Sequence, residues 1–338
     1  MTTYREAGVD LDKAEELIER IGWRVTATWT DDVMGGFGGF AAGLRVPPGY
    51  VKPVLMMATD GVGTKAELAR VTGLVEGLGY DLLAMVGDDL AAAGATPIAL
   101  QDYIAVGHLD LDRIEAIVES IADACMDSDV ALLGGETAEH PGIIEGDRFD
   151  VAATALGIVE LGDEIDTSTI VAGDAIIGVH SPNLRSNGFS LVRALIVDQL
   201  DLDADFPGTD QPAAEVLLAP SMIYAPAVNN ALARVKPHGL AHITGGGLPG
   251  NLARILPEGT GAVIERSRWE VPDVFSVIQD LGGVAEAEMF RTFNMGIGFA
   301  AIGPEGDVDK LLTAFITHNH DASVIGRIVE GDGSVEIE

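Results

Sequence analysis

The stretch LMMATDGVGTKAELAR, residues 55–70, decides how the first half of the chain is organised. An apolar run ends in Asp60, glycines follow at 61 and 63, and a helix-like pattern begins after Thr64 and Lys65. The order does not fit a Walker loop, and the dinucleotide pattern GxGxxG lacks its third glycine. What remains is an acid at the end of a predicted strand, where α/β sheets bind ligands. Asp60 is therefore interpreted either as a Mg2+ ligand beside nucleotide phosphate or as the cap of the next helix.

Apolar runs alternate with helical patterns along the whole chain, which is typical of an α/β or α+β fold. Strands are predicted over 54–59, 98–105, 130–134, 149–159, 174–180, 260–265, 295–302 and 322–329. Helices are predicted over 11–20, 80–93, 110–127, 188–200, 221–234, 271–281 and 306–318. The polar, turn-rich stretch at 161–174 is the candidate boundary, so we predict two domains, 1–165 and 166–338.

Composition excludes several classes of protein. The net charge of −33 over 338 residues argues against nucleic-acid binding. Five of the 20 basic residues are lysine; an acidic, lysine-poor surface suits concentrated salt, with an ordinary acidic protein as the alternative. No apolar run is long enough to span a membrane and the start is unlike a signal peptide, so the cytoplasm is predicted. The single cysteine, Cys125, is assigned to the core and excludes an intrachain disulfide.

A second motif, MGGFGGF at 34–40, is rich in glycine. Such a segment cannot hold a helix or strand against its own entropy. It can close over a ligand and offer backbone N–H groups to phosphate oxygens, and a flexible turn is the alternative. The glycines that we assign to nucleotide binding are Gly35, Gly36, Gly38 and Gly39.

Two further acids follow in the first half. Asp89 shares a helical face with Leu82 and Val86, and an acid in an apolar stripe is costly unless it is paired or binds a cation. We therefore prefer Asp89 to Asp88 as a ligand, with a buried acid bound to backbone donors as the alternative. In ALLGGETAEHPG, 131–142, a predicted strand ends in Gly134 and Gly135 and Glu136 follows at once.

Asp60, Asp89 and Glu136 would be three oxygen donors from three segments. Mg2+ usually takes one or two carboxylates and completes its octahedron with phosphate oxygens and water. We predict that the three converge near one nucleotide-bound Mg2+. Zinc is not predicted, because the seven histidines show no paired spacing and there is no cysteine pair.

The second half carries three loops of similar design. SPNLRSNGFSLVRAL, 181–195, places Arg185 before a predicted helix start; AHITGGGLPGNLARIL, 241–256, places His242 before a glycine triplet; and MFRTFNMGIGF, 289–299, precedes a glycine-rich strand. Each alone could be a structural loop end. Together they point to an anion site at helix starts. The residues that we assign to substrate binding are Ser186, Asn187, Thr244, Gly245, Gly246, Gly247, Arg291 and Asn294.

These motifs, in this order and spacing, resemble the phosphoribosylformylglycinamidine cyclo-ligase (AIR synthetase) family. The resemblance runs from YREAGVD at residue 4 through VMGGFGGF, TDGVGTK, LLGGETAEHPG, SNGFSLVR and AHITGGGLPGNLARILP to RTFNMGIG, and it covers nearly the whole chain. It implies a two-domain fold whose N-terminal sheets pair into a barrel in a homodimer.

The resemblance also implies a reaction in purine biosynthesis. ATP activates the formamide oxygen of formylglycinamidine ribonucleotide, a nitrogen of the same substrate closes the ring, and aminoimidazole ribonucleotide, ADP and phosphate leave. Phosphorylation turns a poor leaving group into a good one, and the protein supplies Mg2+, N–H groups and positive charge. In this interpretation Asp60 binds Mg2+, Gly61 and Gly63 let phosphate approach, and Lys65 neutralises it. Arg185 and His242 are assigned to the catalytic site of the second half.

The chain departs from the family pattern at three places. Only Arg24 is basic in the segment before the glycine loop, which is often rich in lysine and arginine. Arg185 stands where histidine is frequent, and a guanidinium cannot act as a base, so we predict that it binds phosphate. Met295 stands where cysteine is common.

Two other functions fit part of this pattern. Superfamily relatives with similar glycine and aspartate motifs include thiamine-monophosphate kinase, selenide-water dikinase and a hydrogenase maturation protein. A non-catalytic homologue that only binds nucleotide or a partner is the second alternative, and the arginine at 185 is its main support.

Overall fold

The computed structural model describes residues 3–195 and 199–338. The chain divides into two compact units, which we describe separately. Unit 1 comprises Met1–Leu90 and Pro97–Leu161, and unit 2 comprises Ala91–Thr96 and Gly162–Glu338. The boundary predicted after residue 165 falls within unit 2, four residues beyond Leu161.

Unit 1 is built on a four-stranded sheet with the order β3-β6-β4-β5. Its strands are β3 (Pro53–Gly61), β4 (Thr96–Val106), β5 (Ala131–Glu139) and β6 (Phe149–Glu160). Strand β3 is antiparallel to β6, whereas β4 and β5 are parallel. Strands β3 and β5 therefore form the two edges of the sheet.

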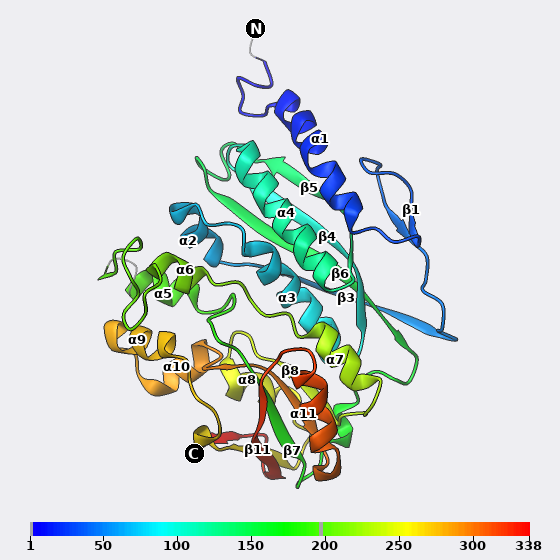
Figure 1. Ribbon diagram of the computed structural model, residues 1–338, viewed down its shortest axis with the longest axis vertical. Coiled ribbons are helices and arrows are strands. Elements are labelled where there is room, and N and C mark those ends of the chain that lie inside the picture. The colour runs from blue at the N-terminus through cyan, green and yellow to red at the C-terminus, as the bar shows by residue number, and fades with distance from the viewer. Residues whose placement is uncertain (1–2, 196–198) are drawn as a thin grey trace. The chain divides into compact units, whose positions relative to one another are not determined.

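Helices cover one face of this sheet (Figure 1). They are α1 (Leu11–Ala27), α2 (Lys65–Thr72), α3 (Leu78–Ala92) and α4 (Leu111–Asp127). Helix α4 begins where the Asp110 carboxylate accepts from the Arg113 amide, and it buries Ile114, Ile117 and Ile121 at helical spacing. Cys125 is buried on the same helix, and burial raises the pKa of its thiol, so its assignment to the core is confirmed.

The other face of the sheet is less well covered within the chain. Alternate residues of β3 point to it, and the side chains of Leu55 and Met57 are 54% and 71% exposed. Their antiparallel partners on β6 are Ile158 and Leu156. This face is apolar and open at the β3 edge.

A short hairpin follows α1 and carries the glycine loop. Strand β1 (Val33–Met34) pairs with β2 (Gly43–Leu44), and residues 35–42 form the connection. The glycines of the motif are therefore exposed at the end of a hairpin, as its composition predicts.

Unit 2 is a six-stranded sheet with the order β12-β9-β11-β7-β10-β8, in which only β12 and β9 pair in parallel. The strands are β7 (Ala175–His180), β8 (Gly239–His242), β9 (Thr260–Ile264), β10 (Ile297–Gly303), β11 (Ala322–Glu330) and β12 (Val335–Ile337). The helices are α5 (Phe189–Leu195), α6 (Ala213–Leu218), α7 (Ala225–Leu232), α8 (Gly247–Ala253), α9 (Asp273–Gly282), α10 (Glu286–Thr292) and α11 (Val308–Ile316). The helix predicted over 188–200 includes residues 196–198, which lie outside the described part.

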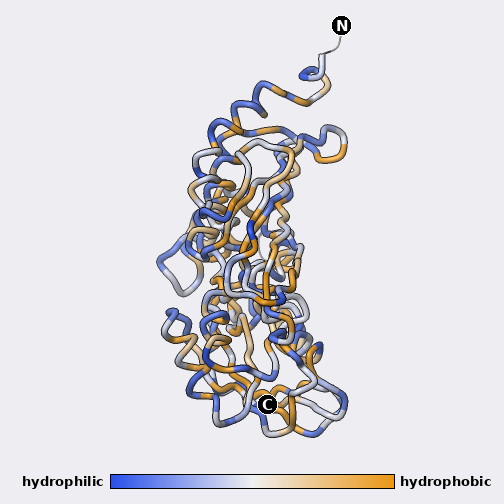
Figure 2. The backbone as a smooth tube through the Cα atoms, turned by 90° about the vertical axis from the view of Figure 1, so that its right-hand side faces the viewer, coloured by the Kyte–Doolittle hydropathy of each residue, from blue (hydrophilic) through white to orange (hydrophobic). Residues whose placement is uncertain are grey.

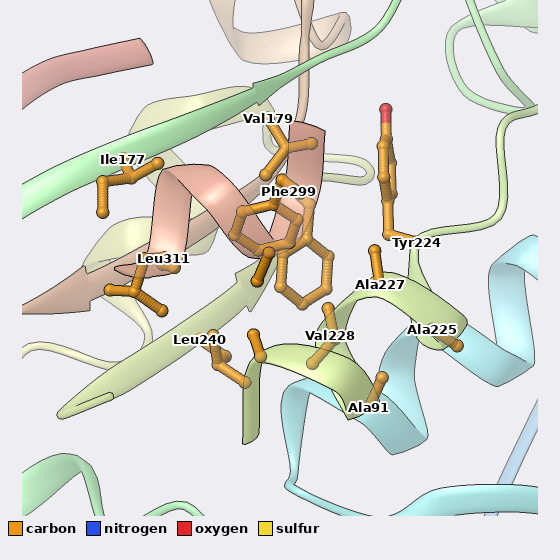
Figure 3. Packing of buried hydrophobic residues seen from close by; sticks show 14 of the residues in the cluster. Ala91, Ile177, Val179, Tyr224, Ala225, Ala227, Val228, Leu240, Phe299 and Leu311 are labelled. Carbon is orange, nitrogen blue, oxygen red and sulfur yellow. The ribbon is translucent and has the colours of Figure 1, made fainter. Parts of the chain in front are cut away.

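The core of unit 2 lies where α7 and α11 pack on the sheet. Val179, Phe299 and Leu311 meet Tyr224 and Val228 there (Figure 3), and all five are completely buried. Burying a large apolar side chain contributes roughly 1.5–3 kcal/mol, so this cluster fixes the sheet on which the second-half loops stand.

Apolar residues are distributed along the chain in short segments (Figure 2). Within residues 3–195 and 199–338, no helix is long and apolar enough to cross a membrane.

Candidate nucleotide and substrate sites

A cavity of about 360 Å³ lies in unit 1, between helix α1, the glycine loop and strands β4 and β5. Its wall is polar and apolar in nearly equal parts, and its apolar side includes Leu17, Ile18 and Ile21 from α1. Its polar lining residues are Gln101, Asp102, Glu136 and Thr137. The volume is within the range of small-molecule sites.

The glycine loop forms one wall of this cavity, from Gly36 to Ala42. Gly36, Gly38 and Gly39 line it, whereas Gly35 lies just outside with a φ of +101°. The ring of Phe37 packs against helix α1 so closely that a Cβ at Gly22 would lie 2.9 Å from it. The loop is thus anchored by one aromatic ring, while Phe40 lines the cavity with its side chain fully exposed.

Strand β5 brings its glycine pair and Glu136 to the same cavity. Gly135 lies opposite Asp102 of β4, and a Cβ at Gly135 would come within 1.7 Å of the Asp102 Oδ1. Only glycine fits at this position. The motif GGE therefore admits the side chain of Asp102, and Glu136, which is exposed, also lines the cavity.

Sequence reasoning missed Asp102. It is partly buried, and burial raises the pKa of its carboxyl group to about 7. Within the described residues the structure gives this carboxylate no hydrogen bond or ion pair. The signal was available, since Asp102 is an acid inside the mostly apolar strand IALQDYIAV, 98–106.

Asp60 lies exposed at the end of β3, and its Oδ1 accepts from the Gly61 amide at 2.7 Å. The N-cap of helix α2 is Thr64, and no side chain caps that helix. The helix-cap alternative for Asp60 is therefore wrong. Gly63, with a φ of +60°, makes the turn between the strand and the helix.

The reason for preferring Asp89 to Asp88 as a ligand on α3 was also wrong. Asp88 is the buried residue, with no exposed surface, and Asp89 is exposed. Helix α3 is apolar on most of its surface, so its periodicity did not identify the buried face. Asp89 is accessible to a ligand because it is exposed, and not because it lies in an apolar stripe.

The three predicted metal ligands are not gathered within the chain. Asp60 and Glu136 lie on the two edge strands, so three strand spacings, roughly 14 Å, separate their backbones. In the described part of the chain, no group of three or more histidine, cysteine, aspartate or glutamate side chains is arranged to hold a metal ion. The assignment of each carboxylate to Mg2+ stays a prediction.

The structure corrects the prediction that Lys65 neutralises phosphate. Its side chain is completely buried, and its Nζ lies 2.6 Å from the Asp81 Oδ2, which is equally buried. A buried ammonium needs such a counter-charge. The lysine of TDGVGTK therefore joins α2 to α3 and is not presented to a phosphate.

The structure also corrects the prediction that Arg185 binds phosphate. It is 1% exposed and has a φ of +59°. Its guanidinium lies 4.7 Å from the ring centroid of Tyr224 and donates to the Gly298 carbonyl oxygen at 3.1 Å. The side chain points into unit 2, so it is not open to the phosphate that we predicted for it.

The three loops of the second half meet around β10. Asn294 donates to the Asn183 carbonyl and accepts from the Gly296 amide, so this buried residue joins two of the loops and is not open to substrate, contrary to prediction. The loop at 241–256 also lies close, because a Cβ at Gly247 would come within 1.8 Å of the Phe290 carbonyl oxygen.

The other predicted residues of unit 2 lie on these loops. Ser186 is 8% exposed, and its hydroxyl has no hydrogen-bond partner among the described residues. His242 is buried at the end of β8, with its ring 6.4 Å from that of Phe299. Asn187, Thr244 and Gly246 are partly exposed, and Gly245 and Arg291 are exposed.

Comparison with known proteins identifies the chain. Residues 41–159 match the N-terminal domain of AIR synthase related proteins, and residues 171–338 match the C-terminal domain. Phosphoribosylformylglycinamidine cyclo-ligase of Sorangium cellulosum (strain So ce56) is 45% identical, covering 97% of this chain and 95% of the relative. The enzyme of the same name from Myxococcus xanthus (strain DK1622) is 43% identical, covering 98% and 97%. The chain belongs to the AIR synthetase family.

Solved structures confirm the AIR-synthetase-like fold in both units. A thiamine-monophosphate kinase from Stenotrophomonas maltophilia K279a superposes with a TM-score of 0.70 at 20% identity, covering 94% of this chain and 96% of that one. A hydrogenase maturation protein in complex with ATP gives 0.71 at 18% identity, covering 98% and 93%. At these identities the likeness is one of fold alone. The AIR synthetase assignment rests on the sequence relatives.

Proposed function

We infer that this chain carries out the phosphoribosylformylglycinamidine cyclo-ligase reaction. The observation that carries this inference is its identity of 42–45% with four bacterial proteins of that name, over nearly the whole of each chain. ATP phosphorylates the formamide oxygen of formylglycinamidine ribonucleotide. A nitrogen of the same molecule then attacks the formamide carbon, and the oxygen departs with phosphate. The products are aminoimidazole ribonucleotide, ADP and phosphate.

ATP binds in unit 1 under this proposal. Support comes from the cavity wall formed by residues 36–42, whose glycines bring backbone N–H groups close to a ligand. Because Lys65 is buried in an ion pair, these backbone donors carry more of the phosphate binding than we expected from the sequence.

Mg2+ is proposed as the partner of ATP. Asp60, Asp89 and Glu136 are all exposed, and a nucleotide-bound Mg2+ needs only one or two carboxylates from the protein. The residues thus fit the ion singly or in pairs. When bound, Mg2+ neutralises phosphate charge during transfer. The carboxylates hold the ion and orient the nucleotide.

Formylglycinamidine ribonucleotide binds on the loops of unit 2. The best support is the buried Ser186 hydroxyl, which lacks a partner and would gain one from a ligand oxygen. Further donors come from Asn187, Arg291 and the segment Thr244–Gly246, which are exposed or partly exposed. His242 and Arg185 hold the loops that carry these groups.

A homodimer through unit 1 is also proposed. The open face of the sheet exposes Leu55 and Met57 at the β3 edge, and an uncovered apolar edge strand invites pairing with another chain. A second copy would cover it by joining the two sheets into a barrel. Sedimentation equilibrium should find a dimer at micromolar concentration, and Leu55→Lys with Met57→Lys should release monomer. A wild-type monomer would contradict the proposal.

The cytoplasmic location stays a prediction that cell fractionation can test.

The reaction is tested by incubating the protein with ATP and formylglycinamidine ribonucleotide. ADP release should require the ribonucleotide, and the product should be lighter than the substrate by one water molecule. A kinase would add a phosphoryl group to its substrate, and a homologue that only binds nucleotide would release no ADP. Asp60→Asn should reduce turnover without changing the unfolding temperature, whereas Glu336→Gln, at an exposed site in unit 2, should change neither.

A further inference from the structure

We propose that Asn183 is a positioning residue of the ribonucleotide site, because it fixes the loop 181–188 in the conformation that presents the Ser186 hydroxyl. This inference rests on the proposed function, which puts formylglycinamidine ribonucleotide on the loops of unit 2. Asn183 was not among the residues predicted from the sequence. It acts through Ser186 and not on the substrate directly.

Asn183 connects three segments of unit 2. Its Nδ2 donates to the Pro220 carbonyl oxygen at 2.8 Å, and its Oδ1 accepts from the Arg185 amide at 3.0 Å. Its main-chain carbonyl oxygen accepts from the Asn294 Nδ2 at 2.9 Å and from the Ser181 hydroxyl at 3.0 Å. One residue therefore ties the loop after β7 to the segment between α6 and α7 and to the loop before β10.

The backbone that these bonds hold is strained. Arg185 has a φ of +59°, and Met295, in the loop before β10, has a φ of +49°. Residues with a Cβ disfavour this left-handed region, and they stay in it only where the surrounding structure fixes them. The Asn183 Oδ1 fixes the first turn by accepting from the Arg185 amide, and the Asn294 Oδ1 fixes the second by accepting from the Gly296 amide at 2.8 Å.

Ser186 follows the first of these turns directly. It is 8% exposed, and its hydroxyl has no hydrogen-bond partner among the described residues. A buried hydroxyl without a partner is unfavourable, so the loop holds it in place and not a bond of its own. Gly188 closes the loop with a φ of +81°, and a Cβ there would lie 2.1 Å from the Phe293 ring. The hydroxyl therefore stands between two fixed points, the Asn183 bonds and the Phe293 contact.

A ribose phosphate offers the partner that this hydroxyl lacks. A serine hydroxyl donates to a phosphate oxygen, and it either donates to or accepts from a ribose hydroxyl. A group that is already in place when the substrate arrives loses little freedom on binding, which raises the affinity. Loss of Asn183 should therefore weaken binding of the ribonucleotide, although every group that touches the substrate is still present.

The experiment measures kcat and the KM for each substrate in variants of Asn183. We expect Asn183→Ala to raise the KM for the ribonucleotide about tenfold, which corresponds to the loss of one hydrogen bond. The KM for ATP and kcat should stay within about twofold of the wild type, because only binding of the ribonucleotide is affected. Asn183→Ser should recover part of the loss, since its hydroxyl can accept from the Arg185 amide more weakly. An unchanged KM for the ribonucleotide in Asn183→Ala would overturn the proposal.

A double variant shows whether Asn183 acts through Ser186. Ser186→Ala alone should raise the KM for the ribonucleotide. Adding Asn183→Ala to it should change this KM by less than about twofold, because the group that Asn183 positions is already gone. If the two effects multiply, Asn183 acts on something else and the proposal fails.

A matched control separates positioning from a general loss of stability. Asp174 is buried just before β7, at the opposite end of the strand from the loop 181–188. Its carboxylate accepts from the Val171 amide at 3.0 Å and lies 2.7 Å from the His238 Nδ1. Asp174→Ala should lower the unfolding temperature without changing the KM for the ribonucleotide. If it raises this KM as much as Asn183→Ala does, the positioning role is wrong.

The outcomes also distinguish this proposal from the proposed function. If the wild type converts the ribonucleotide and Asn183→Ala leaves its KM unchanged, the reaction stands and the positioning role fails. If the wild type binds the ribonucleotide in titration calorimetry without converting it, the proposed reaction fails. The dissociation constants of the same variants then decide the role of Asn183, with the tenfold loss as the supporting result. If the wild type does not bind the ribonucleotide, both proposals fail.

Discussion

The Nζ of Lys65 and the Oδ2 of Asp81 form an ion pair of 2.6 Å in which neither side chain has any exposed surface. This pair joins the first residue of α2 to the first turn of α3. It explains why TDGVGTK resembles a phosphate loop without being one. The lysine is at the start of a helix, as in a Walker loop, but its ammonium group pairs with a buried carboxylate.

Breaking this pair should destabilise the fold. Lys65→Met leaves the Asp81 carboxylate buried without its counter-charge, and we expect a loss of about 3–5 kcal/mol in the free energy of unfolding. The double variant Lys65→Met/Asp81→Leu should recover most of it, because both charges are gone. Urea denaturation measures each value. A stable Lys65→Met protein that no longer binds ADP would restore the phosphate role that we first predicted.

Arg185 should also act through the fold. Arg185→Met removes the hydrogen bond to Gly298 and the contact with Tyr224, and should cost about 2 kcal/mol of stability. Arg185→Lys should recover less than half, since it keeps the charge without the planar group. We expect the KM for the ribonucleotide to change by less than about threefold in Arg185→Lys. A tenfold rise in KM at unchanged stability would show direct contact with the phosphate.

Asp102 makes stability depend on pH. Its pKa is raised by burial from 3.8 to about 7, so the folded chain retains a proton that the unfolded chain has lost in this range. Its contribution therefore reduces stability as the pH rises from 4 to 7, by at most about 4 kcal/mol. Asp102→Asn should be more stable than the wild type at pH 8, with a smaller difference at pH 5. A difference that does not vary with pH would contradict this.

The charge of −33 predicts a response to salt. Repulsion between surface carboxylates opposes folding in dilute buffer, and the screening length falls to about 3 Å at 1 M salt. The unfolding temperature should therefore rise between 0.1 M and 2 M KCl, in thermal scans followed by circular dichroism. A flat response would favour an ordinary acidic protein over one adapted to salt.

The elements that the sequence predicted best are those with a strong period. Helix α4 was predicted over 110–127 and observed over Leu111–Asp127, and β6 was predicted over 149–159 and observed over Phe149–Glu160. Short elements such as β8 (Gly239–His242) and α10 (Glu286–Thr292) were missed, because four to seven residues give too little periodicity.

The candidate site was predicted less completely than the fold. Glycine loops are visible in a sequence because only glycine tolerates their backbone, so residues 36–39 and 134–135 were found. The burial and the partners of Lys65, Arg185 and Asn294 were not predicted, because both depend on which residues the fold places opposite each side chain. Asp102 was overlooked for a related reason: its importance comes from Gly135, which lies on the neighbouring strand and 33 residues later in the chain.

The most direct test of the central claim follows one oxygen atom. Formylglycinamidine ribonucleotide labelled with oxygen-18 in its formamide group is converted in unlabelled water, and the released phosphate is analysed by mass spectrometry. Because ATP activates that oxygen before the ring closes, the label should appear in inorganic phosphate, one atom for each product formed. Label found in water, with unlabelled phosphate, would contradict the account.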